Sequence, residues 1–254
     1  MQFEEQLRAG AMAPADLPRL ARRAGVSGVE FREVYWKDRP HEIPPTRRAI
    51  DDHGVIATYA TFSTLLDADP NARARLLEQI DDARDLGVSI MRVFRGAWPF
   101  GGDEKSMWAG ARTAIERAAD YGITLMLENY LRVPGNHRFE LEAALHVLRA
   151  PNLRVNVDIA NYVQNGEDPL ANIRAFGSRI GYSHLKDVRR TETRLAVVPV
   201  GDGDLDWSEI LDHYDATGNP FPLTLEHQGG DDPLASIVRA REALERSGLP
   251  TLPG

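Results

Sequence analysis

The sequence predicts an α/β fold, a (β/α)8 TIM barrel whose first strand is truncated, and three observations support this. Short apolar runs alternate with amphipathic helical segments almost throughout the 254 residues, as in proteins built from βα units on a parallel sheet. The runs are rich in Val, Ile and Leu, which is typical of strands buried on both faces. No glycine-rich phosphate turn follows the run Gly28–Arg32, although such a turn is usual in the alternative architecture, an open doubly wound sheet.

Seven apolar runs are expected to form strands of the barrel. They are Gly28–Arg32, Val55–Thr61, Val88–Phe94, Ile123–Glu128, Leu153–Asp158, Ile180–Leu185 and Pro222–Glu226. A closed barrel of this type has eight strands, and the missing one should come before the first of these runs. Only Met1–Phe3 is available there, so we expect a stub of a strand, or a chain start that is cut or misassigned.

Three of the helices between the strands are expected to begin at Asp-Pro pairs, because Asp caps a helix N-terminus and Pro suits the first turn. The pairs are Asp69-Pro70, Asp168-Pro169 and Asp232-Pro233. The first helix, Pro70–Leu86, should end at Gly87. The other expected helices are Ala15–Ala24, Pro44–His53, Asp103–Tyr121, Arg138–Leu148 and Ser208–Thr217, the last with a capping box at Asp206 and Glu209.

The composition excludes several classes of function. The absence of cysteine excludes disulfide scaffolds, thiolate zinc sites and cysteine nucleophiles. A net charge of -8 disfavours nucleic acid as a partner, because binding phosphates needs clustered Lys and Arg. No apolar run approaches the roughly 20 residues of a membrane helix, and the start MQFEEQLRAG is too charged for a signal peptide. We therefore expect one cytoplasmic domain, residues 1–254, with neither a nucleic-acid nor a membrane partner.

Four successive strands are expected to end in residues that can bind a metal ion. These residues are Glu128, Asp158, His184 and Glu226. Active sites of such barrels lie at the C-terminal ends of the strands, so the four side chains should converge. Three carboxylates gathered there would repel one another without a cation. The pattern predicts one divalent ion, with a hydrogen-bonded network of carboxylates and histidine as the alternative.

The ligand types narrow the choice of ion. Three oxygen ligands and one imidazole suit a hard or borderline divalent ion, so Mn²⁺ is favoured, with Mg²⁺, Co²⁺ and Zn²⁺ as alternatives. Without thiolates, a structural zinc site is disfavoured. Four protein ligands leave two positions of an octahedral ion open, and two adjacent oxygens of a small-molecule substrate could fill both.

Six short segments carry a resemblance to a known family. They are GVSGVEF, LMLENY, VNVDIANY, YSHLKD, VGDGDLDW and LTLEHQ. In this order the chain resembles the sugar phosphate isomerase/epimerase superfamily, whose members are xylose isomerase-like TIM barrels, from about Ala15 to Leu249. The resemblance implies a homo-oligomer, a dimer or tetramer, that acts on a keto sugar or related polyol. It also implies that Glu128 and Glu226 are catalytic acids and bases as well as ligands, one on either face of the sugar.

The implied chemistry is proton abstraction next to a carbonyl through a metal-stabilised enediolate, which agrees with the expected ligands. Return of the proton to the opposite face gives an epimer, and its transfer to the neighbouring carbon gives an isomer. Loss of a β-hydroxyl would instead give a lyase or dehydratase, acting on an inosose, a 3-keto-glycoside or a dehydroshikimate-like substrate. Asn161 stands where ketose epimerases carry a histidine, and it cannot titrate near neutral pH. A noncatalytic or accessory barrel subunit is a further alternative, and a DNA-repair nuclease would need more histidines and a basic groove.

Two basic residues follow the expected histidine ligand. Lys186 lies two residues after His184, on the same side of the strand. It is a candidate catalytic residue that holds a substrate oxygen or stabilises an enolate, with an ion pair to Asp187 as the alternative. Arg190 is expected in the same loop, where it either binds a substrate carboxylate or phosphate or remains a solvated charge.

Three further residues are candidate substrate contacts. Asn161 could hydrogen-bond a hydroxyl, and Trp98 could stack on a sugar face or merely seal the top of the barrel. Glu30, on the strand Gly28–Arg32, could face the site or pair with a core arginine such as Arg92. The glycines of VGDGDLDW suggest a phosphate loop, but a turn into the next helix is the simpler interpretation because the segment lacks Lys.

Overall fold

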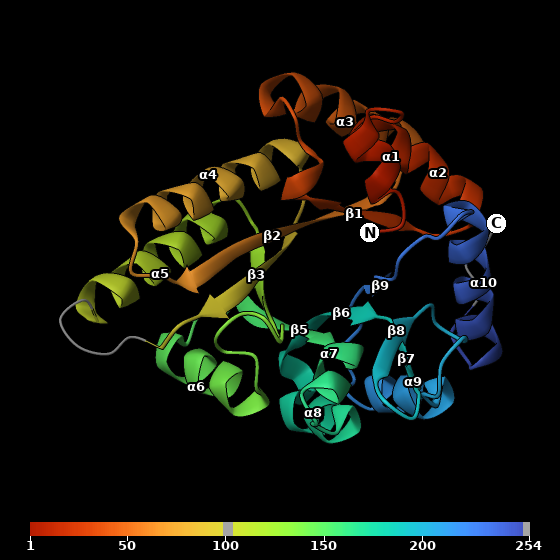
Figure 1. Cartoon of the computed structure of the whole chain (residues 1–254). Coiled ribbons are helices and arrows are strands. Elements are labelled where there is room, and N and C mark those ends of the chain that lie inside the picture. The colour runs from red at the N-terminus through yellow and green to blue at the C-terminus, as the bar shows by residue number, and fades with distance from the viewer. Residues whose placement is uncertain (99–103, 251–254) are drawn as a thin grey trace.

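A computed structural model describes residues 1–98 and 104–250, and seven parallel strands within it form a nearly closed barrel surrounded by helices (Figure 1). The strand order is β1-β2-β3-β4-β5-β6-β9. The strands are β1 Gly28–Arg32, β2 Ile56–Leu66, β3 Ile90–Gly96, β4 Thr124–Glu128, β5 Leu153–Asp158, β6 Ile180–Leu185 and β9 Leu223–Leu225. All seven expected strands are confirmed, as is the TIM-barrel fold class.

The helices cover the outside of the barrel (Figure 1). They are α1 Glu4–Ala9, α2 Leu17–Ala24, α3 Arg39–His53, α4 Pro70–Leu86, α5 Glu104–Asp120, α6 Arg138–Leu148, α7 Ile159–Gln164, α8 Pro169–Phe176, α9 Trp207–Asp215 and α10 Pro233–Arg246. The three Asp-Pro starts are confirmed, because each Asp accepts an amide hydrogen bond from the first turn of its helix. Within the described residues, 1–98 and 104–250, no helix is long and apolar enough to cross a membrane.

Some helix boundaries differ from the expected ones for identifiable reasons. Helix α3 begins at Arg39, although Pro44 was expected in its first turn, because Pro40 takes that position and Pro44 and Pro45 lie inside the helix. Residue Asp103 of the expected helix 103–121 lies outside the described residues, and α5 runs from Glu104. The short helices α1 and α7 were not expected.

The chain start does not form the expected stub of a strand. Residues 1–3 turn into α1, and the Gln2 side-chain amide donates a 2.9 Å hydrogen bond to the carbonyl oxygen of Leu225 in β9. Strands β1 and β9 are not paired with each other. A cavity of about 160 Å³ lies between them and is lined by residues 1–3, by both strands and by Ile237 of α10.

A two-stranded antiparallel hairpin follows β6, where a loop was expected. Its strands are β7 Asp187–Arg190 and β8 Leu195–Val198. The expected loop position of Arg190 is therefore wrong: it ends β7 and its side chain is exposed. The charged segment RRTETR, which covers the end of β7 and the turn to β8, hides the alternation that would have indicated a hairpin.

Strand alternation fixes which residues line the interior of the barrel. On β5, Val155 and Val157 are fully buried and belong to the apolar core, while Asn156 contacts His184 on β6 and Asp158 contacts Lys186, directly after β6. The register pairs Asp158 with His184 on β6. Because successive side chains of a strand point to opposite faces, each strand delivers its last interior residue to the same end of the barrel.

Candidate metal centre

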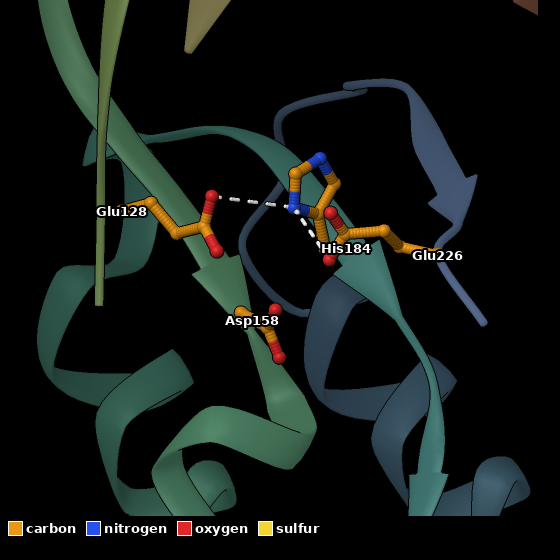
Figure 2. Close-up of side chains that lie close together, drawn as sticks. All are labelled: Glu128, Asp158, His184 and Glu226. Carbon is orange, nitrogen blue, oxygen red and sulfur yellow. Dashed lines mark ion pairs between the residues drawn. The ribbon is translucent and has the colours of Figure 1, made fainter. Parts of the chain in front are cut away.

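The four expected ligands lie together at the C-terminal ends of their strands (Figure 2). Glu128 ends β4, Asp158 ends β5, His184 lies in β6, and Glu226 directly follows β9. One oxygen or nitrogen atom from each side chain lies within 4.8 Å of the others. All four side chains are at most 7% exposed. This clustering makes the group suitable for a metal ion.

Two of the ligand oxygens support that suitability. Glu128 Oε2 and Asp158 Oδ2 are buried and accept no well-oriented hydrogen bond within the described residues, although each lies 2.7 Å from a cationic nitrogen, Arg92 Nε and Lys186 Nζ respectively. The other oxygen of Asp158, Oδ1, accepts the backbone N–H of Asn161 at 2.9 Å and so caps α7. Asp158 is therefore held through one oxygen, while its other oxygen points toward the remaining potential ligand atoms. This arrangement suits a divalent ion that prefers oxygen ligands.

Lys186 contacts the ligand cluster and does not pair with Asp187. Its Nζ lies 2.7 Å from Asp158 Oδ2 and 2.6 Å from Glu226 Oε2. The residue is only 8% exposed. The ammonium therefore lies directly beside an oxygen of each of two expected ligands.

Asp187 has a different role, which the sequence reasoning missed. Its carboxylate accepts hydrogen bonds from the amides of Val188, Gly201 and Leu205 and from the Trp207 indole N–H. A Cβ at Gly203 would lie 2.2 Å from an Asp187 oxygen. The VGDGDLDW segment thus wraps a buried carboxylate, as expected for a turn rather than a phosphate loop. The position of Asp187 directly after the segment YSHLK was the sequence feature that could have indicated this role.

Arg92 and Asn161 both reach Glu128. The Nε atom of Arg92 lies 2.7 Å from Glu128 Oε2, and its guanidinium carbon lies 4.4 Å from the centre of the Phe94 ring. The Asn161 amide donates to Glu128 Oε1 at 3.2 Å. Arg92 therefore pairs with Glu128 and not with Glu30, and Asn161 is adjacent to the cluster.

Glu30 lies behind the imidazole of His184. Its Oε2 atom is 2.7 Å from His184 Nε2, and it accepts a 3.0 Å hydrogen bond from the hydroxyl of Tyr182. The amide of Asn156, a residue that sequence reasoning passed over, lies 3.0 Å from His184 Nδ1. Alternation on β5 and β6 could have indicated Asn156 and Tyr182, because each lies two residues before a ligand.

Two of the expected substrate-binding residues, Trp98 and Arg190, form no hydrogen bond or ion pair with the four clustered residues in the part of the chain that the structure describes. Trp98 is half-buried and packs edge-on against Trp108, with ring centres 5.3 Å apart, and near the guanidinium of Arg95. Arg190 uses its backbone amide to donate to Asp204 at 2.7 Å while its side chain is exposed.

Burial and mutual charge displace the pKa values of the cluster in opposite directions. Burial raises the pKa of Asp158 to about 7, although Lys186 opposes the shift. Burial would also raise the pKa of Glu226, but Lys186 and His184 outweigh it and hold that pKa well below its usual range. Burial disfavours the charged imidazole, yet Glu30 and Glu226 raise the pKa of His184 well above its usual value.

We therefore expect the affinity for a divalent ion to rise with pH between 6 and 8. A ligand must lose its proton before it binds a metal, and with a pKa of about 7 only roughly one Asp158 carboxyl in ten is ionised at pH 6. The expected gain is about tenfold or more, since His184 must also lose a proton. Free Mn²⁺ measured by electron paramagnetic resonance at pH 6, 7 and 8 tests this. An affinity independent of pH would contradict ligation by Asp158.

Comparisons with known proteins bear on the family and the fold. A family model for xylose isomerase-like TIM barrels matches residues 18–247. An inosose dehydratase of Clostridium perfringens is 20% identical over an alignment of 258 positions that covers 87% of this chain and 86% of the dehydratase. D-allulose 3-epimerase of Methylomonas sp., solved in complex with D-allulose, is 19% identical and superposes with a TM-score of 0.72 over 92% of this chain and 91% of the epimerase. A xylose isomerase-like TIM-barrel protein of Mycobacterium smegmatis, solved in complex with magnesium, is 18% identical, with a TM-score of 0.72 and coverages of 92% and 87%. At these identities the two solved structures show a shared fold.

Proposed function

The chain belongs to the family of xylose isomerase-like TIM barrels, and from this membership we propose a divalent-metal-dependent isomerase or epimerase that acts on a keto sugar or related polyol. The observation that carries the proposal is the convergence of Glu128, Asp158, His184 and Glu226, with all four ligand atoms within 4.8 Å of one another. Relatives of the same fold that act on D-allulose or inososes, by their names, support the substrate class. Mn²⁺ is the ion we propose, and the relative solved with magnesium makes Mg²⁺ the first alternative to test.

The four clustered residues would hold the ion. A divalent ion at this position supplies positive charge that stabilises negative charge developing on substrate oxygens. Asp158 and His184 would serve as ligands only, since each is held by a further contact on its other side. Glu128 and Glu226 enter from different sides of the cluster (Figure 2).

Glu128 and Glu226 are the proposed proton carriers. Both are buried, and the cations beside them lower the pKa of each, so both are ionised and able to accept a proton at neutral pH. A carboxylate within hydrogen-bond reach of a carbon-bound proton can remove it when the resulting charge is stabilised. If one glutamate removes the proton and the other returns it, the configuration at that carbon is inverted.

Deuterium exchange tests this proposal. The protein loaded with Mn²⁺ is incubated in D₂O with candidate keto sugars and inososes, the ion is then removed with a chelator, and the products are examined by proton NMR and mass spectrometry. We expect loss of one carbon-bound proton signal, a gain of one mass unit, and no exchange after prior chelation. The absence of exchange with every candidate, in a protein that binds the ion, would contradict the proposed function.

Lyase chemistry is a second candidate, and the position of Lys186 favours it. Its ammonium lies 2.6 Å from Glu226, so an acid stands directly beside a base. Such a pair could protonate a departing β-hydroxyl after the neighbouring proton has been removed. The inosose dehydratase relative is consistent with this outcome. In the same experiment, loss of water with a new enone signal would assign the protein to this class.

A further inference from the structure

We infer that Glu30 is a positioning residue for the ion: it accepts a hydrogen bond from the Nε2–H group of His184 and thereby leaves Nδ1 as the atom that binds the metal. The inference rests on the proposed function, because it concerns the same centre. It departs from the expectation that Glu30 contacts the substrate.

The two ring nitrogens of His184 face different groups. Nε2 lies 2.7 Å from Glu30 Oε2. Nδ1 lies 3.4 Å from Glu128 Oε2 and 3.4 Å from Glu226 Oε2, on the side of the ligand cluster. A neutral imidazole carries one proton, and the partner of one nitrogen decides which nitrogen holds it. When the imidazole is neutral and its proton is directed at Glu30, the lone pair is on Nδ1, which faces the two glutamate oxygens and also lies 3.0 Å from the side-chain amide of Asn156.

Glu30 is itself held in place by a chain of hydroxyl groups. The Tyr182 hydroxyl donates to Glu30 Oε2 at 3.0 Å. The same hydroxyl oxygen accepts a hydrogen bond from the Thr224 hydroxyl at 2.7 Å and lies 2.8 Å from the hydroxyl of Thr58. Tyr182 and the imidazole thus both contact one carboxylate oxygen, which fixes the orientation of Glu30.

The described hydrogen bonds of Glu30 are with His184 and Tyr182, and Glu30 also lines the cavity between β1 and β9 together with Glu226. The side chain of Glu30 is 6% exposed and lies on β1, across the barrel from His184 on β6. The imidazole, with a fully buried side chain, separates it from the ligand oxygens. Carboxylates that orient a metal-binding histidine contribute tenfold to a hundredfold to metal affinity in other proteins.

The test measures Mn²⁺ affinity by electron paramagnetic resonance in variants of the full chain. We expect Glu30→Leu to weaken binding about a hundredfold and Glu30→Gln, which keeps an acceptor but loses the charge, about tenfold. Tyr182→Phe removes only the hydroxyl that orients Glu30 and should weaken binding several-fold. The matched control is Glu167→Gln, since Glu167 pairs with His137 Nδ1 at 2.8 Å, away from the cluster. It should retain the parent affinity.

A spectroscopic signature separates positioning from a general loss of structure. In the parent protein loaded with Zn²⁺, ¹H–¹⁵N correlation spectra should show His184 protonated at Nε2 and metal-bound at Nδ1, and Glu30→Leu should lose the strongly downfield Nε2 proton. Binding of Mn²⁺ by Glu30→Leu and Glu30→Gln within twofold of the parent, or a metal bound at Nε2, would overturn the inference. Failure of the parent itself to bind the ion would instead contradict the proposed function.

Discussion

Replacing Glu226 with Gln is expected to reduce the rate of deuterium exchange into the substrate by about 10³-fold, at the upper part of the range for loss of a general base. The Glu226 carboxylate is buried, and Lys186 and His184 outweigh burial to keep its pKa well below the usual range. A glutamine of nearly the same shape can still contact Lys186 but cannot accept a proton. The measurement is proton NMR in D₂O at saturating Mn²⁺, so that weaker ion binding is compensated by concentration.

Two comparisons make the Glu226 result interpretable. Glu140→Gln is the matched control, because Glu140 pairs with Arg95 at 2.8 Å and lies outside the cluster, and its exchange rate should equal that of the parent. Glu128→Gln should retain partial exchange from one face of the substrate but lose inversion. If Glu226→Gln exchanges deuterium within tenfold of the parent with the ion bound, Glu226 is not the base.

The ligand cluster could be predicted from sequence because strand ends in a parallel barrel share one rim. Each of Glu128, Asp158, His184 and Glu226 closes or directly follows a short apolar run, and no long-range information is needed to see that the runs lie side by side. The same reasoning located all seven strands. It depends only on local alternation and on the uniform direction of the strands.

Contacts across the barrel could not be predicted in this way. Glu30 and His184 are 154 residues apart and meet only because β1 and β6 face each other through the interior. Which side chains meet there depends on strand tilt and register, including the irregular register between β5 and β6. From the sequence, Glu30 was expected either to pair with Arg92 or to face the site. In the structure its carboxylate contacts the imidazole of His184. The hairpin β7–β8 was missed for the different reason that both strands are only four residues long and the first of them is mostly charged.

Lys186 shows how much the choice of partner matters for function. An ion pair with Asp187 would have removed it from the chemistry, whereas contacts with Asp158 and Glu226 place a positive charge beside the ion position. Burial lowers the affinity of a lysine for its proton, but the surrounding carboxylates outweigh burial and raise the pKa of Lys186. The group therefore remains charged at neutral pH.

Replacing Lys186 with Met is accordingly expected to have two opposite effects, tighter ion binding and slower turnover. Two unit charges 4 Å apart repel by about 4 kcal/mol at an effective dielectric constant near 20, and a divalent ion is repelled more strongly. We therefore expect Lys186→Met to bind Mn²⁺ at least about tenfold more tightly. Turnover should nevertheless fall by about 10²-fold or more, since an acid beside the reacting atoms is lost.

The charge-conserving variant Lys186→Arg separates electrostatic repulsion from packing. It should bind Mn²⁺ within a few-fold of the parent, because the positive charge beside Asp158 and Glu226 remains. Loss of dehydration with retained deuterium exchange in Lys186→Met would show that the ammonium protonates a leaving group, and loss of both would place it at the carbonyl oxygen. Weaker ion binding by Lys186→Met would contradict the argument, because the ammonium would then be needed to hold the carboxylates in position rather than acting as a competing charge.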